Sequence, residues 1–124
     1  IGTHVEGAWY SNKNFMVSIY TEDQRVTLDC YITEGVEDFM IPEATYAIGG
    51  TEGYTIDNMG CQVANNHGKN GVVEGYITFK HAEDGYDIFL NVISDIRENV
   101  KIKYSGKIDG YGSGGSAIVN PKAE

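Results

Sequence analysis

The chain contains no apolar run that approaches the roughly 20 residues needed by a membrane-spanning helix. Positive charge is also scarce, because nine Lys and Arg residues stand against 18 Asp and Glu residues and leave a formal net charge of −9. Binding to nucleic acid or to an anionic membrane surface depends on clustered Lys and Arg. We therefore expect no membrane-spanning segment, and neither nucleic acid nor an anionic membrane surface as a partner.

Motifs for catalysis and metal binding are missing as well. None of the three histidines has a second ligand at a suitable spacing, and neither HExxH nor a paired CxxC occurs. The segment Gly112–Gly115 contains Ser113 but lacks the GxSxG spacing of a nucleophile elbow. We therefore expect a protein without a metal or cofactor that is not an enzyme. A hydrolase that uses two facing carboxylates, one with a raised pKa, is the enzymatic alternative.

Only two cysteines occur, Cys30 and Cys61. Cys30 shares its parity with Leu28 and Ile32, so its simplest role is that of a small core residue. A disulfide between the two cysteines would close a loop of about 30 residues and stabilise the fold by roughly 3–4 kcal/mol. The sequence leaves both the bridge and the free thiols open, and two cysteines alone assign no compartment.

What the chain does contain is alternation of apolar and polar residues with a period of two. Three consecutive runs between Gly71 and Ile108 predict antiparallel strands, with turns around 83–85 and 94–98. Shorter runs predict further strands, and no helix of useful length is expected. These further strands lie at 5–10, 15–20, 25–33, 44–48 and 53–57.

The predicted architecture is a single all-β domain over 1–109, followed by a Gly/Ser-rich tail over 110–124. The two longer connections, 34–43 and 58–71, are typical of crossings between sheets and favour an antiparallel β-sandwich of 7–8 strands. A small β-barrel built from neighbouring pairs is the alternative. Within this tail, 110–116 is interpreted as a flexible linker or a frayed end, and 116–120 could add a last short strand that ends at Pro121.

One pattern on the outward parity of the strands is a candidate binding surface. Nine tyrosines occur against four phenylalanines, and four aromatic residues fall opposite the main apolar face: Tyr20, Tyr31, Tyr76 and Phe89. If their strands are neighbours, the rings form a stacking platform for a glycan or a protein. The alternative is that a loop or the chain ends cover these rings, or that they brace the stems of Lys101 and Lys103.

Near the start of the chain, Gly7-Ala8-Trp9 resembles the Gly-x-Trp opening of lipocalins and other calycins. That resemblance implies an antiparallel barrel in which Trp9 closes one end. It also implies that a basic residue from a late strand, Lys103 or Lys107, packs on the indole. The functional implication is a carrier of a small apolar ligand, which requires an unfilled cavity inside the barrel.

A wider pattern is similar to all-β modules of secreted or lipid-anchored bacterial surface proteins, some of which accompany glycan capture. It covers most of the chain and departs from the usual Gly before Thr-Tyr, since Ala44 stands there. Its segments are Trp9-Tyr10, 42–46, 71–79, 85–90 and 104–108. The resemblance implies a secreted or cell-surface location and binding rather than catalysis, and it transfers no site residues.

Two functional hypotheses follow. The first is a non-enzymatic binding module of a secreted or cell-surface bacterial protein, with a glycan or a protein as its ligand. The second is a calycin-like carrier of a small apolar ligand. A purely structural spacer within a longer protein also fits the Gly-rich tail. The sequence leaves the oligomeric state open.

Overall fold

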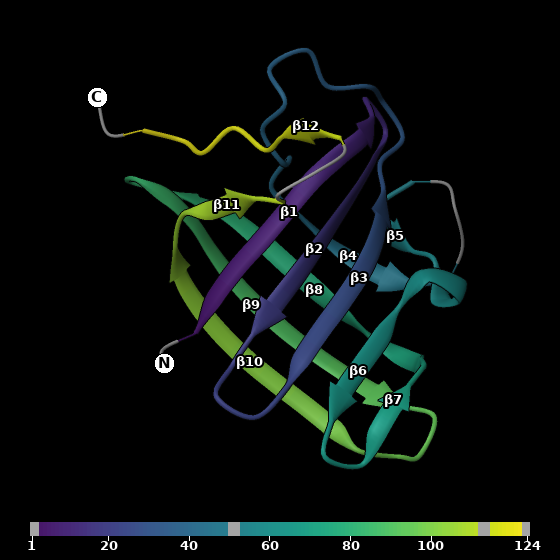
Figure 1. Ribbon diagram of the computed structural model, residues 1–124. Helices are drawn as coiled ribbons and strands as arrows, with labels where there is room; N and C mark the ends of the chain where they lie inside the picture. Colours follow the sequence, from purple (N-terminus) through teal and green to yellow (C-terminus); the bar gives the residue numbers. More distant parts are fainter. Residues whose placement is uncertain (1–2, 50–52, 112–114, 123–124) are drawn as a thin grey trace.

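The computed structural model describes residues 3–49, 53–111 and 115–122, and the regular secondary structure of these residues is almost entirely β-strand (Figure 1). One short 3₁₀ helix, η1 (Asn58–Gly60), interrupts them. The strands are β1 (His4–Ser11), β2 (Asn14–Tyr20), β3 (Arg25–Tyr31), β4 (Ala44–Ile48), β5 (Thr55–Ile56), β6 (Gln62–Asn65), β7 (Gly68–Asn70), β8 (Val72–Ala82), β9 (Gly85–Ser94), β10 (Asn99–Gly106), β11 (Ile108–Gly110) and β12 (Ser116–Ala117). In the described part of the chain, no helix has the length and apolar character to cross a membrane.

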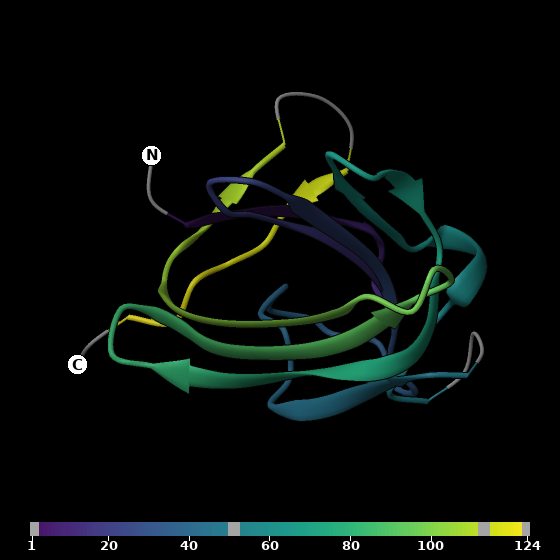
Figure 2. The ribbon, with the colours of Figure 1, turned by 90° about the horizontal axis from the view of Figure 1, so that it is seen from below.

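The strands make one continuous sheet, in the order β10-β9-β8-β4-β5-β3-β2-β1-β11. Figure 2 shows this sheet curling round on itself, so that β1, β2 and β3 lie across from β8, β9 and β10. The all-β class is therefore confirmed. The arrangement is the barrel that the sequence left as the alternative, since one nearly closed sheet takes the place of the two sheets of a sandwich.

The two ends of the sheet come together where β10 passes directly into β11. Gly106 ends β10 with a φ of 150°, and β11 then pairs in parallel with β1, with Val5 opposite Ile108. Gly85 lies against this corner, and a Cβ placed on it would be 2.2 Å from the Gly106 carbonyl oxygen. Two glycines thus allow the β8–β9 turn and the end of β10 to approach closely.

The longer connections do not cross between sheets. Part of 58–71, expected to be irregular, forms the hairpin β6–β7, which pairs with β3 through Arg25 and Ala64. Its two-residue turn is followed by Gly68 at a φ of 103°, so the Asn/Gly-rich composition marks the turn of a hairpin. The other connection, 34–43, folds over one end of the barrel, where Val36 and Phe39 pack against the core.

The core lies inside the barrel, where inward-facing residues from every long strand meet. Near the end that contains Trp9, five buried aromatic rings contact one another at centroid distances of 4.9–6.2 Å. These are Trp9, Phe15, Tyr46, Phe79 and Tyr86, each at most 1% exposed. Most of these contacts are edge-to-face, the arrangement that aromatic quadrupoles favour. The rings therefore fill the interior at this end.

A small set of hydrogen bonds closes the same end of the barrel. The Phe39 carbonyl accepts from the Trp9 indole Nε1 at 2.8 Å and from the Val119 backbone N–H at 2.9 Å. The Tyr86 hydroxyl accepts from the Ile41 N–H at 2.9 Å and donates to the Val119 carbonyl at 2.6 Å. The loop 34–43 and the C-terminal segment are thus tied to each other and to the barrel wall.

The last short strand expected over 116–120 forms in part, as β12, and residues 115–122 lie against the barrel. β12 pairs with β1, Ile118 is 5% exposed and Pro121 is buried. The Asn120 side chain donates to the Ile108 carbonyl and accepts from the Ile108 N–H. Glycine and serine content predicted flexibility, but the apolar residues that follow supply enough burial to hold the segment. Residues 112–114, including Ser113, lie outside the described residues.

Neither lysine that the calycin resemblance implied lies on the indole of Trp9. Lys103 Nζ is 6.0 Å from the ring centroid of Phe89, and Lys107 pairs with Asp84 at 3.7 Å. The rings of Phe15 and Phe39 contact Trp9 instead, at 4.9 and 6.2 Å between centroids.

Gly7 provides a test of how the C-terminal segment is held. A Cβ placed on Gly7 would lie 2.6 Å from the Met16 carbonyl oxygen and 2.7 Å from Cδ1 of Ile118. We expect Gly7→Ala to lower the free energy of unfolding by about 1–3 kcal/mol, the usual cost of overpacking. Urea denaturation measures the change. Gly110→Ala is the matched control, since nothing lies within 4 Å of its Cβ position. Equal stability of the two variants would contradict this packing.

Candidate functional site

The outer face of β8, β9 and β10 presents its side chains in rows that cross the three strands. One row places Phe89 between Thr78 and Lys103, and the next places Asp87 between Lys80 and Ser105. These rows follow directly from the antiparallel register, because residues opposite each other on neighbouring strands point to the same face. Six polar and aromatic side chains thus share one patch of surface.

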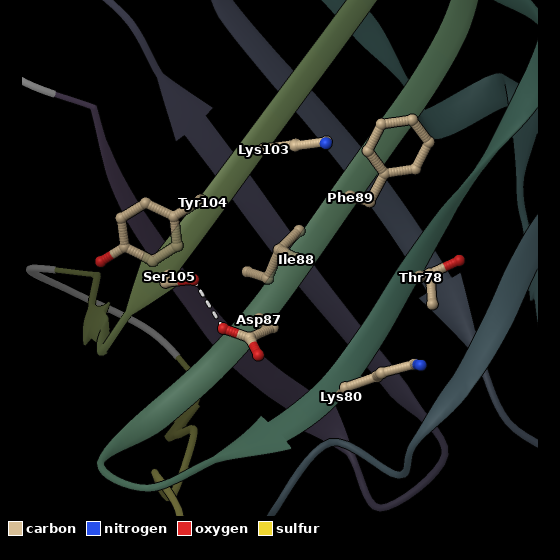
Figure 3. A pocket seen from close by; sticks show the side chains of 8 residues that line it. All are labelled: Thr78, Lys80, Asp87, Ile88, Phe89, Lys103, Tyr104 and Ser105. Carbon is tan, nitrogen blue, oxygen red and sulfur yellow. Dashed lines mark hydrogen bonds between the residues drawn. The ribbon is translucent and has the colours of Figure 1, made fainter.

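A hollow of about 340 Å³ lies over these two rows (Figure 3). Its lining consists of Thr78, Lys80, Asp87, Ile88, Phe89, Lys103, Tyr104 and Ser105. The Ile88 side chain has inward parity and is 3% exposed, so the outward residues supply the chemistry of the hollow. We call this surface the β8–β10 hollow.

Phe89 provides the flat apolar surface of the hollow. Its half-buried ring lies 6.0 Å from the Tyr76 ring, with a tilt of 47° between their planes. Lys103 Nζ lies 6.0 Å from the Phe89 centroid, at the outer limit of a cation–π contact. The side chain of Lys103 extends toward Phe89 in Figure 3, as expected if the ring braces a lysine stem.

Polar groups surround this ring on the same face. Asp87 Oδ1 accepts a hydrogen bond from the Ser105 hydroxyl at 2.6 Å, drawn as the dashed line in Figure 3. The Thr78 and Thr45 hydroxyls share a hydrogen bond of 2.9 Å. Thus acceptors, donors and a ring stand within one hollow, the combination that orients a polar ligand.

A second hollow, of about 380 Å³, continues the first toward β4. It shares Thr78 and Lys80 with the β8–β10 hollow and adds Glu43, Ala44, Thr45 and Phe79. Together the two hollows cross four neighbouring strands, β10, β9, β8 and β4. At about 4.8 Å per strand, this groove spans about 14 Å. Its length suits an extended ligand better than a compact one.

Tyr20 lies far from this groove in the sheet. It ends β2 and stacks on the His4 ring, with 4.5 Å between centroids and 2° between planes. Nearby, the Tyr111 hydroxyl is hydrogen-bonded to Ser18 at 2.8 Å. Tyr20 therefore belongs to a separate polar and aromatic group on the outside of β1 and β2.

Tyr31 lies at the opposite end of the β2–β3 pair, opposite Asn14. Loss of hydration, together with the negative charges of Asp29 and Asp57, raises its pKa. The structure therefore joins Tyr76 and Phe89 but places Tyr20 and Tyr31 elsewhere. Parity predicted that all four face outward, but β4 and β5 separate β8 from β3 in the sheet.

Asp29 and Asp57 are the acid pair closest to the enzymatic alternative. Burial, and then the charge of Asp57, raise the pKa of Asp29 against the opposing hydrogen bond from Asn14. Both carboxylates already have structural partners, since Asp57 Oδ1 accepts from the Met59 N–H at 3.0 Å and caps η1. Within the described residues, no three His, Cys, Asp or Glu side chains gather in a way that could hold a metal ion.

Both cysteines are free thiols inside the fold. Cys30 is fully buried in the core, as predicted, and Cys61 is 7% exposed. Burial raises the pKa of Cys30 well above its usual value, and it raises the pKa of Cys61 to about 12. The Cys61 thiol also donates to the Asp57 carbonyl at 3.0 Å. Thiols in such surroundings are protonated and unreactive at neutral pH.

Several residues of the groove were not identified from the sequence. Thr78, Lys80 and Ser105 share the outward parity that singled out Tyr76 and Phe89, so parity was the available signal. Thr45 and Glu43 had no such signal, because their place in the groove depends on β4 pairing with β8.

Comparison of the chain with known proteins found no matching family model, curated protein or solved structure.

The Asp29 carboxyl gives a test based on pH. Because folding raises its pKa above the usual 3.8, the folded protein binds this proton more tightly than the unfolded chain. The contribution of the protonated Asp29 carboxyl to the free energy of unfolding is fully present below about pH 3.8, and it is lost as the pH rises through the raised pKa. We expect Asp29→Asn, which keeps the acceptor for Asn14, to gain stability relative to wild type as the pH rises.

Urea denaturation at several pH values between about 3 and 7 measures this difference. Glu83→Gln, at an exposed turn, is the control and should show no such trend. A stability difference between Asp29→Asn and wild type that stays constant with pH would contradict the assignment.

Proposed function

We propose that this protein is a non-enzymatic module that binds a glycan in the groove on the outer face of β4, β8, β9 and β10. The observation that carries the proposal is the half-buried Phe89 ring beside Asp87, Ser105 and Thr78 in one hollow. A sugar ring has an apolar C–H face and a rim of hydroxyls. An aromatic ring with hydrogen-bonding groups around it complements both features.

The hydrogen-bonding capacity of the hollow supports a ligand rich in hydroxyls. Asp87 uses one carboxylate oxygen for Ser105 and has its other oxygen available to accept from a sugar hydroxyl. The Ser105 hydroxyl donates its proton to Asp87 and can still accept from a sugar hydroxyl, and the Thr78 hydroxyl can form one more hydrogen bond beside the one it shares with Thr45. A groove about 14 Å long accommodates an oligosaccharide better than a single small molecule.

The interior of the barrel favours this outer surface over the carrier hypothesis. A carrier of a small apolar ligand needs an unfilled cavity near Trp9, and five packed aromatic rings occupy that end. The proposed ligand therefore lies outside the barrel wall.

The proposed setting is a secreted or cell-surface protein of a bacterium. This part of the proposal is supported by the sequence resemblance to bacterial surface modules alone. A protein ligand at the same face is the competing outcome, and a screen against glycans distinguishes the two.

Replacement of the aromatic ring tests the proposal. After an array of plant, host and microbial glycans identifies a ligand, we expect Phe89→Ala to weaken its binding about tenfold or more, because the stacking surface is lost. Isothermal titration calorimetry measures the affinity. Phe89→Tyr, which keeps a ring, should retain most of the binding.

Tyr20→Ala is the matched control for this experiment. It removes an outward aromatic ring at a position remote from the groove and should leave the affinity unchanged. Full affinity in Phe89→Ala, or an array on which nothing binds, would rule out the proposed site.

A further inference from the structure

The groove contains two lysines that form no ion pair with the described residues. Lys80 and Lys103 both line the β8–β10 hollow, and no carboxylate of the described residues lies within 4.0 Å of either ammonium group. Asp87 is the one carboxylate in the lining of that hollow, and it keeps its negative charge although it accepts from the Ser105 hydroxyl. Glu43 lines the neighbouring hollow instead, where it accepts from the His81 backbone N–H at 2.8 Å. Two ammonium groups against one carboxylate leave the β8–β10 hollow with a small excess of positive charge.

This local charge is opposite to that of the chain as a whole. The formal net charge is −9, and only nine basic residues are available to the entire sequence. A negative protein repels anions over most of its surface, so two unpaired lysines beside one aromatic ring create a local exception. Complementary charge of this kind selects a ligand that carries the opposite sign.

We infer that the β8–β10 hollow takes an acidic glycan, one whose sugars bear carboxylate groups, with Lys80 and Lys103 as the residues that recognise the charge. The inference rests on the proposed function, since Phe89 must still stack on a sugar ring. The inference specifies in addition that the ligand is negatively charged and that Lys80 and Lys103 bind its acid groups.

The positions of the two lysines favour several acid groups along one chain. They stand two strands apart and two residues out of register, with Phe89 and Asp87 on the strand between them. This arrangement separates their Cα atoms by about 12 Å. An oligosaccharide with two acid groups, such as a polyuronate, can reach both lysines, whereas one small anion cannot.

The test uses one sugar backbone in a charged and a neutral form. Hexagalacturonic acid and its fully methylated ester are titrated into the wild-type protein and into the double variant Lys80→Met/Lys103→Met. We expect the wild type to bind the acid about tenfold more tightly than the ester. The double variant should bind the acid about tenfold more weakly than wild type, up to about fivefold for each lysine, with ester binding unchanged.

The control variant makes the same change of charge elsewhere. Lys13→Met/Lys69→Met removes two exposed lysines that lie outside the groove, and it should bind both ligands as the wild type does. Equal loss of acid binding in this control would mean that only the overall charge matters, and it would overturn the inference.

Other outcomes distinguish a failure of the acidic-glycan inference from a failure of the proposed glycan binding. Equal binding of acid and ester by the wild type overturns the acidic glycan and leaves glycan binding standing. Binding of hexaglutamate as tightly as hexagalacturonate means that the site reads charge without sugar, and overturns both. Binding of neither sugar, together with an array on which nothing binds, also overturns both.

Discussion

The carbonyl group of Phe39 is the point on which the closed end of this barrel depends. It accepts from the indole of Trp9 and from the backbone N–H of Val119, so it joins the first strand, the loop 34–43 and the C-terminal segment. Phe39 reaches this position with a φ of 58°, a conformation that costs about 1–2 kcal/mol for a residue with a side chain. Two hydrogen bonds and the edge contact of its ring with Trp9 offset that cost. Together with the hydrogen bonds of Tyr86 and Asn120, this junction holds the C-terminal segment on the barrel.

Closing the barrel determines which surface remains for binding. Inward positions are taken by aliphatic side chains and by the aromatic cluster around Phe15, all withdrawn from water. Side chains at outward positions do not fill the core. In β9, for example, Ile88 and Leu90 face the core, whereas Asp87 and Phe89 face solvent. A half-buried aromatic ring on such a face exposes apolar area that folding alone does not require. The register of β8, β9 and β10 then gathers hydroxyls, a carboxylate and two ammonium groups around it.

Local pattern predicted much of this fold, and non-local pairing accounts for most of what it missed. Alternation identified the three long strands and most of their inward residues, since each strand's parity is a property of adjacent residues. It placed Val73 on the inward face, but a β-bulge at the start of β8 puts Val72 in the core and leaves Val73 exposed. It could not choose between sandwich and barrel, because that choice depends on β4 joining β8 and on β11 joining β1, both distant in sequence. The same limit applies to the site. Parity placed Tyr76 and Phe89 outward, whereas their separation from Tyr20 and Tyr31 and the contribution of Thr45 follow from strand order.

The side chain of Asn120 affects whether one edge of the sheet can pair with another chain. Its amide nitrogen donates to the carbonyl of Ile108 and its oxygen accepts from the same residue's N–H, so one side chain imitates a neighbouring strand. β11 is the last strand of the sheet, and an unoccupied edge there would be a template for another chain. The Asn120 side chain takes up the N–H and carbonyl of Ile108, and a side chain cannot continue the sheet as a strand would. The C-terminal segment thus covers the edge of β11 at Ile108, where another chain could otherwise pair.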